Sequence, residues 1–239
     1  MDYTVNNEYF SINGVDCRTV GLWCDTLDVP QMAKQRYTTF QTSADEDRTT
    51  PDDSFENVKY KLTFFVIDGS YDDTAICNYI TGVRTLTISR LENYYFKVRS
   101  VELSSAQKYK GDLIKYTATL NLAPFKYAVS NDQITLQPGD TVTNNGTRYS
   151  RPTIEVAGSA TIHFTCNGEE FTIILPDSGQ TVIIDSERYV TYDSTTGVIL
   201  QNAVSGYYPM LAVGNNVINW TCEGGATVYV KIRKNERWY

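Results

Sequence analysis

The sequence predicts a mainly β protein of two domains, and three observations lead to this prediction. The chain has 239 residues, more than one typical small domain needs. Aromatic residues, which favour strands, make up 13% of it. Short segments of alternating apolar and polar residues recur along both halves, separated by Gly, Asn, Asp and Pro. We expect a β-sandwich-like domain with one short helix over residues 1–142, and a jelly-roll sandwich over residues 143–239.

The first segment predicts a hairpin. Phe10 and Ile12 precede an Asn13-Gly14 pair, and apolar residues resume at Val15. Asn-Gly is the strongest two-residue signal for a tight turn between antiparallel strands. We therefore expect a short hairpin at the start of the first domain.

A polar stretch then precedes a strand. Residues 43–54 are acidic and contain Pro51, which predicts a loop of about a dozen residues. The stretch also lacks the glycine and the terminal glutamate of a calcium-binding EF-hand loop. The strand that follows places one set of apolar residues on the same face: Tyr60, Leu62 and Phe64.

One helix is predicted in the first half. Asp72 or Asp73 can cap it, and Gly82 is expected to end it in a left-handed conformation. Its apolar stripe has the i, i+3, i+4 spacing of a helix: Ile76, Tyr79 and Ile80. Further strands follow, and we expect Pro124 to close the last long one of this domain.

A second Asn-Gly pair, Asn167-Gly168, fixes the register of a hairpin in the second half. With these two residues as the loop, two alternating patterns agree, because a slip of one residue would invert every side chain. The residues on the buried face are Ala160, Ile162, Phe164, Phe171, Ile173 and Leu175. The outer face carries Thr161, His163, Thr165, Glu170 and Thr172.

Residue types with catalytic chemistry are sparse. His163 is the only histidine, and the register places it on an outer strand face between threonines, where a solvated side chain is expected. A Gly-x-Ser-x-Gly elbow and zinc-ligand spacing are both missing. Glu169 and Glu170 are neighbours on one strand, so they point to opposite faces and cannot form the facing pair of a glycosidase. We expect no enzyme activity, no catalytic residue, no metal and no cofactor.

Net charge and cysteine content exclude further classes of function for this protein. The formal net charge is −7 and a basic stripe is missing, which argues against nucleic acid as a partner. The cysteines lack CxxC spacing and are expected as buried free thiols: Cys17, Cys24, Cys77, Cys166 and Cys222. Neither an apolar run of about 20 residues nor a signal-peptide pattern is present, so we expect cytoplasmic synthesis without membrane insertion.

Aromatic residues of the second half suggest a different class, a carbohydrate-binding module. Sugar rings stack on exposed aromatic side chains, and the candidates are Tyr189, Tyr192, Tyr207, Tyr208 and Trp220. Tyrosine is also a good strand residue with a polar tip, which explains the same pattern without a ligand. A module that recognises a bacterial surface glycan, with Trp220 as its platform, and more remotely a glycosidase, remain the alternatives.

The order of the segments resembles the distal tail proteins of siphophage-type tails. The matching segments, in chain order, are FSINGVDCRTVGLWC, YYFKVRSV, LAPFKYA, NNGTRYSRPTIEVAGS, FTIIL, IIDSERYVTYD and YPMLAVGNNVINW. Two departures accompany the likeness. The stretch after Phe40 lacks a glycine-rich turn, and the second half lacks the large carbohydrate-binding insertion of longer relatives.

This resemblance implies a structural protein of the virion, made in the host bacterial cytoplasm and placed at the tail tip. Its first domain would form a hexameric ring with copies of itself, and its second, a galectin-like sandwich, would dock partners. The implied partners are the tail-tube protein, a tail-associated or tip protein, and baseplate or receptor-binding proteins. The joint at 143–152 would separate the two modules. Inter-subunit contacts are expected in the 37–56 stretch, at Tyr37, Phe40 and Phe55.

Overall fold

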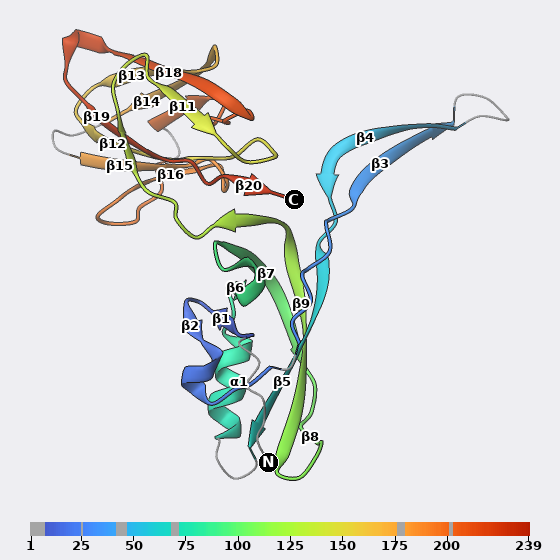
Figure 1. Ribbon diagram of the computed structural model, residues 1–239. Coiled ribbons are helices and arrows are strands. Elements are labelled where there is room, and N and C mark those ends of the chain that lie inside the picture. The colour runs from blue at the N-terminus through green and yellow to red at the C-terminus, as the bar shows by residue number, and fades with distance from the viewer. Residues whose placement is uncertain (1–7, 25, 42–46, 68–71, 176–179, 201–202) are drawn as a thin grey trace. The chain divides into compact units, whose positions relative to one another are not determined.

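The computed structural model describes residues 8–24, 26–41, 47–67, 72–175, 180–200 and 203–239 (Figure 1). These residues are mainly strands in antiparallel sheets, as predicted. They divide into two compact units, Met1–Val129 with Tyr239, and Ser130–Trp238. Among the described helices, none has the length and apolar character needed to cross a membrane.

The first unit is built on one antiparallel sheet. Its strands follow the order β2-β1-β6-β7-β9, and β5 and β8 also pair with β9. The strand bounds are β1 (Phe10–Ile12), β2 (Val15–Asp16), β5 (Val58–Ile67), β6 (Thr85–Ile88), β7 (Tyr94–Leu103), β8 (Gln107–Lys108) and β9 (Leu113–Ala128). The helical segments are η1 (Cys17–Val20), α1 (Asp73–Thr81) and η2 (Ser89–Leu91).

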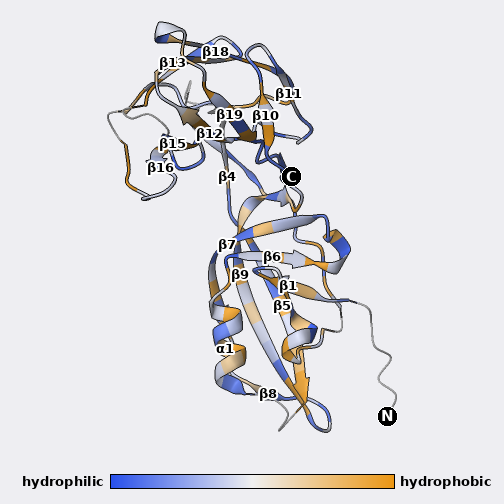
Figure 2. Cartoon of the chain, turned by 90° about the vertical axis from the view of Figure 1, so that its left-hand side faces the viewer, coloured by the Kyte–Doolittle hydropathy of each residue, from blue (hydrophilic) through white to orange (hydrophobic). Residues whose placement is uncertain are grey.

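The core of this unit lies between the sheet and α1, which runs along one side of the sheet (Figure 2). Alternate residues of β5 are buried, and they include the predicted apolar face of Tyr60, Leu62 and Phe64. Phe64 pairs with Tyr116 of β9, and the two rings stack with centroids 5.5 Å apart. Burial of these large side chains supplies most of the force that holds sheet and helix together.

Local signals predicted the hairpin and the helix start correctly. Asn13 and Gly14 have φ of 53° and 82°, the two positive values that a type I′ turn requires, and Ile12 pairs with Val15. Asp72 caps α1 by accepting the backbone N–H of Thr74 at 2.9 Å.

The prediction for Gly82 was wrong in its conformation. Gly82 follows the last residue of α1 with φ −75°, which is not left-handed. Its N–H donates to the carbonyl of Asn78, and a Cβ at this position would lie 2.9 Å from that carbonyl oxygen. Close approach of backbone to backbone is therefore what glycine permits here.

Pro124 does not close a strand either, because β9 continues through it to Ala128. The pairing with β7 shifts register on either side, with Val98 opposite Leu122 and Phe96 opposite Lys126. The proline sits in the irregular stretch between these pairs, where a missing N–H costs no ladder hydrogen bond.

The predicted loop at 43–54 is also corrected. Residues 47–54 belong to β4 (Asp47–Phe55), which pairs with β3 (Gln35–Gln41) in a separate two-stranded sheet, while residues 43–46 lie outside the described residues. Pro51 lies opposite Tyr37 within this ribbon. Each strand of a two-stranded ribbon has one free edge, so a proline is tolerated in it.

The second unit is a sandwich of two five-stranded sheets, with strand orders β10-β19-β12-β15-β16 and β11-β18-β13-β14-β17. One apolar cluster fills the space between them, and it draws residues from both sheets. The first sheet comprises β10 (Ile134–Leu136), β12 (Thr153–Gly158), β15 (Gln180–Asp185), β16 (Val190–Asp193) and β19 (Tyr229–Arg233). The second comprises β11 (Thr141–Asn144), β13 (Thr161–Cys166), β14 (Glu169–Ile174), β17 (Val204–Gly206) and β18 (Gly214–Cys222). η4 (Glu223–Gly225) and β20 (Arg237–Trp238) complete the unit.

The division between the units at 129/130 differs from the predicted boundary at 142/143. The residues in between include β10, which pairs with β19, and β11, which pairs with β18. Both strands are edge strands of the second unit's sheets, so their hydrogen bonds place them there.

The hairpin β13–β14 has the predicted register. Phe164 pairs with Phe171 and Ile162 with Ile173, and all four side chains are buried. Asn167 and Gly168 form the turn with φ of 54° and 88°. The alternation of apolar and polar residues in the sequence is therefore sufficient to predict the register of this hairpin.

Candidate interaction surfaces

The β3–β4 ribbon is the first candidate, because β3 exposes both of its faces over residues 36–39. Successive strand residues point to opposite faces, and the four consecutive residues 36–39 are all exposed. Tyr37 is 58% exposed. A two-stranded ribbon without a buried face is marginally stable in water. Such a ribbon gains most from a surface that covers it.

The structure places the three predicted interface residues in different environments. Tyr37 lies exposed within β3. Phe55 ends β4 and is half-buried, and its ring meets that of Phe125 edge-on with centroids 5.2 Å apart. Phe40 pairs with Arg48 through the backbone, and its side chain lies outside the described residues.

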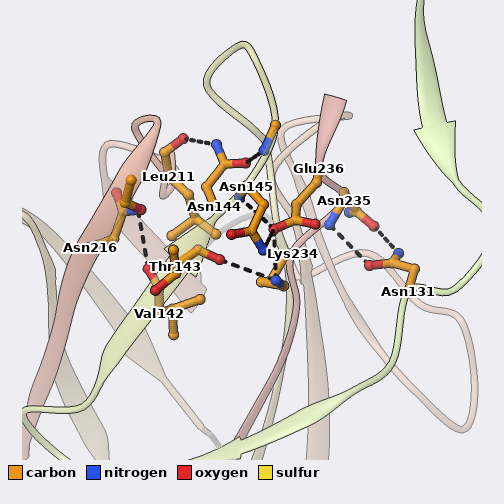
Figure 3. Close-up of polar contacts among 12 residues, drawn as sticks. Asn131, Val142, Thr143, Asn144, Asn145, Leu211, Asn216, Lys234, Asn235 and Glu236 are labelled. Atoms are coloured by element: carbon orange, nitrogen blue, oxygen red, sulfur yellow. Dashed lines mark hydrogen bonds and ion pairs between the residues drawn. The ribbon is translucent and has the colours of Figure 1, made fainter. Parts of the chain in front are cut away.

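The segment 143–152, predicted as a joint, lies inside the second unit and is held by buried asparagines (Figure 3). Asn144 donates through Nδ2 to the carbonyls of Arg148 and Leu211 at 3.0 and 3.1 Å, and its Oδ1 accepts the N–H of Gly146 at 2.9 Å. Asn216 is likewise buried, and its Nδ2 lies within 3.2 Å of the carbonyl of Val142. The Asn-Asn-Gly motif of residues 144–146 therefore has a structural role, because it forms hydrogen bonds within the second unit.

Two further contacts tie the C-terminal stretch to the same region of this unit. Glu236 accepts the backbone N–H of Asn145 at 2.8 Å and pairs with Lys234 at 2.7 Å. Asn235 and Asn131 bond to each other, with the side-chain amide of Asn131 donating at 2.7 Å (Figure 3). Sequence reasoning missed this network, because its partners are up to 104 residues apart.

Titratable groups do not gather into a catalytic arrangement in the described part of the chain. His163 is on the outer face of β13, as predicted, with 52% of its side chain exposed. Asp193 accepts hydrogen bonds from the backbone N–H groups of Thr196 and Thr195, which shape the turn after β16. No group of three or more His, Cys, Asp and Glu side chains is placed to hold a metal ion within these same residues.

The aromatic platform suggested for sugar binding is not formed by Trp220. This side chain is only 7% exposed, and it stacks on Phe164 with centroids 5.9 Å apart and an interplanar angle of 3°. The hypothesis is wrong for Trp220 because β18 alternates, and Ile218 and Trp220 both face the core. Tyr207 and Tyr189 are exposed, whereas Tyr192 and Tyr208 are both half-buried.

The cysteines occur as free thiols, and Cys17, Cys24 and Cys166 are buried as predicted, whereas Cys77 and Cys222 are only half-buried. Burial raises the pKa of Cys166 to about 11. A thiol with so high a pKa is almost wholly protonated at neutral pH and therefore unreactive.

Taken together, the described residues of the two units form a mainly β protein with exposed strand surfaces. In fold it is similar to the crystal structure of SPP1 Dit (gp 19.1), described as a paradigm of the hub adsorption apparatus in phages that infect Gram-positive bacteria. The TM-score is 0.63 at 13% sequence identity, and the match covers 98% of this chain and 100% of that chain. The sequence itself matches no protein-family model and no curated protein. The resemblance to distal tail proteins expected from the sequence is thus confirmed at the level of fold.

Proposed function

We propose that this chain is a distal tail hub protein, a structural component at the tip of a phage tail. The observation that carries the proposal is the similarity in fold to a phage hub protein along 98% of this chain and the whole of that one. The order of the segments in the sequence supports the same conclusion independently. In this role the protein acts through surfaces that fit those of neighbouring subunits, without a cofactor, a metal or a chemical reaction of its own.

The first unit would form the hexameric ring, and the β3–β4 ribbon is its proposed contact with a neighbouring copy. A closed ring needs one surface that fits a different surface on an identical subunit. The ribbon supplies free strand edges and the exposed ring of Tyr37. Phe40 and Phe55 belong to the same two strands and complete the proposed interface.

The second unit, residues 130–238, would be a galectin-like sandwich that docks other tail proteins. Its candidate partners are the tail-tube protein, a tail-associated or tip protein, and baseplate or receptor-binding proteins. The chain would be made in the host bacterial cytoplasm and end in the virion. Nucleic acid and membrane are not among the proposed partners.

The mass of the purified protein in solution tests this proposal. Light scattering over rising concentration should show a ring of about 160 kDa, six copies of 27.0 kDa, and negative-stain images should show six-fold rings. Tyr37→Glu should leave the fold intact, because the side chain is exposed, and should lower the mass toward one copy. Tyr229→Glu, an equally exposed tyrosine of the second unit, should leave the ring unchanged. A strict monomer that also fails to bind tail-tube and baseplate proteins would overturn the proposal.

A further inference from the structure

The outer face of the second unit carries a depression of about 190 Å³ over strands β13, β14 and β18. Cross-strand pairing arranges its polar side chains in two rows of three. The first row is Thr172, His163 and Thr221, and the second is Glu170, Thr165 and Asn219. Each row therefore crosses all three strands, and the six side chains share one face of the sheet.

The imidazole of His163 lies in the middle of the first row and has a partner at each ring nitrogen. Nε2 lies 3.3 Å from Glu223 Oε1, and Nδ1 lies 3.3 Å from the hydroxyl oxygen of Thr172. With both nitrogens engaged, the ring can present its face to a ligand.

Several neighbouring groups are available to a ligand. Among the described residues, the side chains of Glu170, Asn219 and Thr221 make no hydrogen bond within the protein. They offer a carboxylate, an amide and a hydroxyl, and so provide both donors and acceptors. This mixture suits a ligand that carries several hydroxyl groups of its own.

The charge of the surface narrows the class of ligand. Strands β13, β14, β17 and β18 contain no lysine or arginine, whereas Glu170 lines the depression and Glu223 contacts His163, another of its lining residues. An anionic ligand would meet two carboxylates without a compensating cation. The depression is also smaller than the pockets of about 300–1,000 Å³ that hold drug-sized ligands. The volume and the charge together favour one small, uncharged, hydroxyl-rich ring.

We propose that this depression binds an uncharged saccharide ring. Glu170 and Asn219 would take paired hydroxyl groups, Thr172 and Thr221 would bond to its edge, and the face of His163 would lie against the ring. This proposal goes beyond the role as a tail hub and does not depend on ring assembly. It also differs from the platform formed by Trp220, which the buried position of that residue excludes.

His163 makes the proposal measurable, because it is the only histidine of the chain and its Cε1–H gives one assignable imidazole NMR signal. The full-length protein is titrated with methyl α-glucopyranoside, methyl β-galactopyranoside and N-acetylglucosamine. At least one of them should shift the imidazole signal saturably, with a dissociation constant of about 1–10 mM, as expected for few contacts on an open surface. Glucuronate, the anionic analogue, should bind at least about tenfold more weakly because of the bordering carboxylates.

Two variants separate this site from non-specific effects. Thr172→Val combined with Asn219→Ala keeps His163 as the reporter and should weaken binding at least about tenfold, since hydrogen bonds from both rows are lost. Thr181→Val, the same kind of change on β15 of the opposite sheet, should leave binding unchanged. The proposal is overturned by any of three results: no saturable shift with the three uncharged sugars, equal affinity in the double variant, or glucuronate binding as tightly as glucoside. Ring assembly measured on the same samples is a separate result, so either proposal can fail alone.

Discussion

At the scale of single residues, Trp220 shows how strand alternation decides the role of an aromatic side chain. We expect Trp220→Ala to lower the free energy of unfolding of the second unit by about 3–5 kcal/mol, because it empties space beside Phe164 in a packed core. Urea unfolding followed by circular dichroism measures this. Tyr229→Ala, at an aromatic residue that is 67% exposed, should change stability by no more than about 0.5 kcal/mol. Equal stability of the two variants would contradict the assignment of Trp220 to the core.

Asp193 should make the stability of the second unit depend on pH in the acidic range. Hydrogen bonds from the backbone N–H of Thr196, from Gln180 and from the Thr196 hydroxyl lower the pKa of this carboxyl from 3.8 to about 2. The folded state favours the ionised form, so the carboxylate stabilises the fold above about pH 4 and this contribution disappears as the pH falls toward 2. Asp193→Asn should therefore be less stable than the natural protein at pH 6, with the difference shrinking between pH 4 and 2 in thermal melts. Thr195→Ala keeps its backbone N–H and serves as the control, and a pH-independent difference for Asp193→Asn would refute the linkage.

At the scale of elements, the buried side chain of Asn144 ties the end of β11 to neighbouring segments of the second unit. Asn144 is 1% exposed, and its removal leaves the carbonyl of Arg148 without this donor and the N–H of Gly146 without this acceptor, whereas the carbonyl of Leu211 still accepts the N–H of Ser150. Each buried group left unsatisfied costs about 1–3 kcal/mol, so Asn144→Ala should destabilise the unit by about 3 kcal/mol in denaturant unfolding. Asn145→Ala is a matched control, because this neighbour is exposed and should cost less than about 1 kcal/mol. Similar losses from both substitutions would show that burial of the amide is unimportant.

Elements with local signals were predicted from the sequence, whereas elements that depend on distant partners were not. Asn13-Gly14 and Asn167-Gly168 encode their turns in two residues; both hairpins form as expected, and the second has the predicted register. The β3–β4 ribbon was missed because Pro51 and its acidic neighbours resemble a loop. Only the pairing of that stretch with β3 shows that the proline lies in a strand.

The candidate surfaces, too, can be predicted where they depend on neighbouring strands, and cannot where they depend on distant ones. The outer position of His163 followed from alternation along one hairpin, since the two strands that define it are adjacent in the chain. The depression around it also needs Asn219 and Thr221 from β18, which pairs with β13 from more than 50 residues away, as in the contact of Thr165 with Asn219. The register of a hairpin does not predict which third strand lies beside it. The depression could therefore not be predicted from the sequence.

At the scale of the whole molecule, net charge opposes the assembly that we propose. Each copy carries a formal net charge of −7, and six copies brought around one axis repel one another. Salt screens this repulsion, since the screening length falls from about 30 Å at 0.01 M to about 10 Å at 0.1 M ionic strength. The fraction of protein found as rings in light scattering should therefore rise between about 0.01 and 0.3 M NaCl at fixed protein concentration.

The direction of this salt effect also reports on the interface itself. Exposed ion pairs across an interface weaken as salt rises, whereas apolar and strand-edge contacts such as those proposed for the β3–β4 ribbon do not. Sucrose at matched osmolality carries no charge, so it separates screening from general effects of solutes: a rise in the ring fraction as large as that with NaCl would mean that solute exclusion, and not screening, favours assembly. Rings that dissociate as NaCl is added would mean that ion pairs hold the subunits together, and the ribbon would then have to be replaced by a charged surface as the contact between copies.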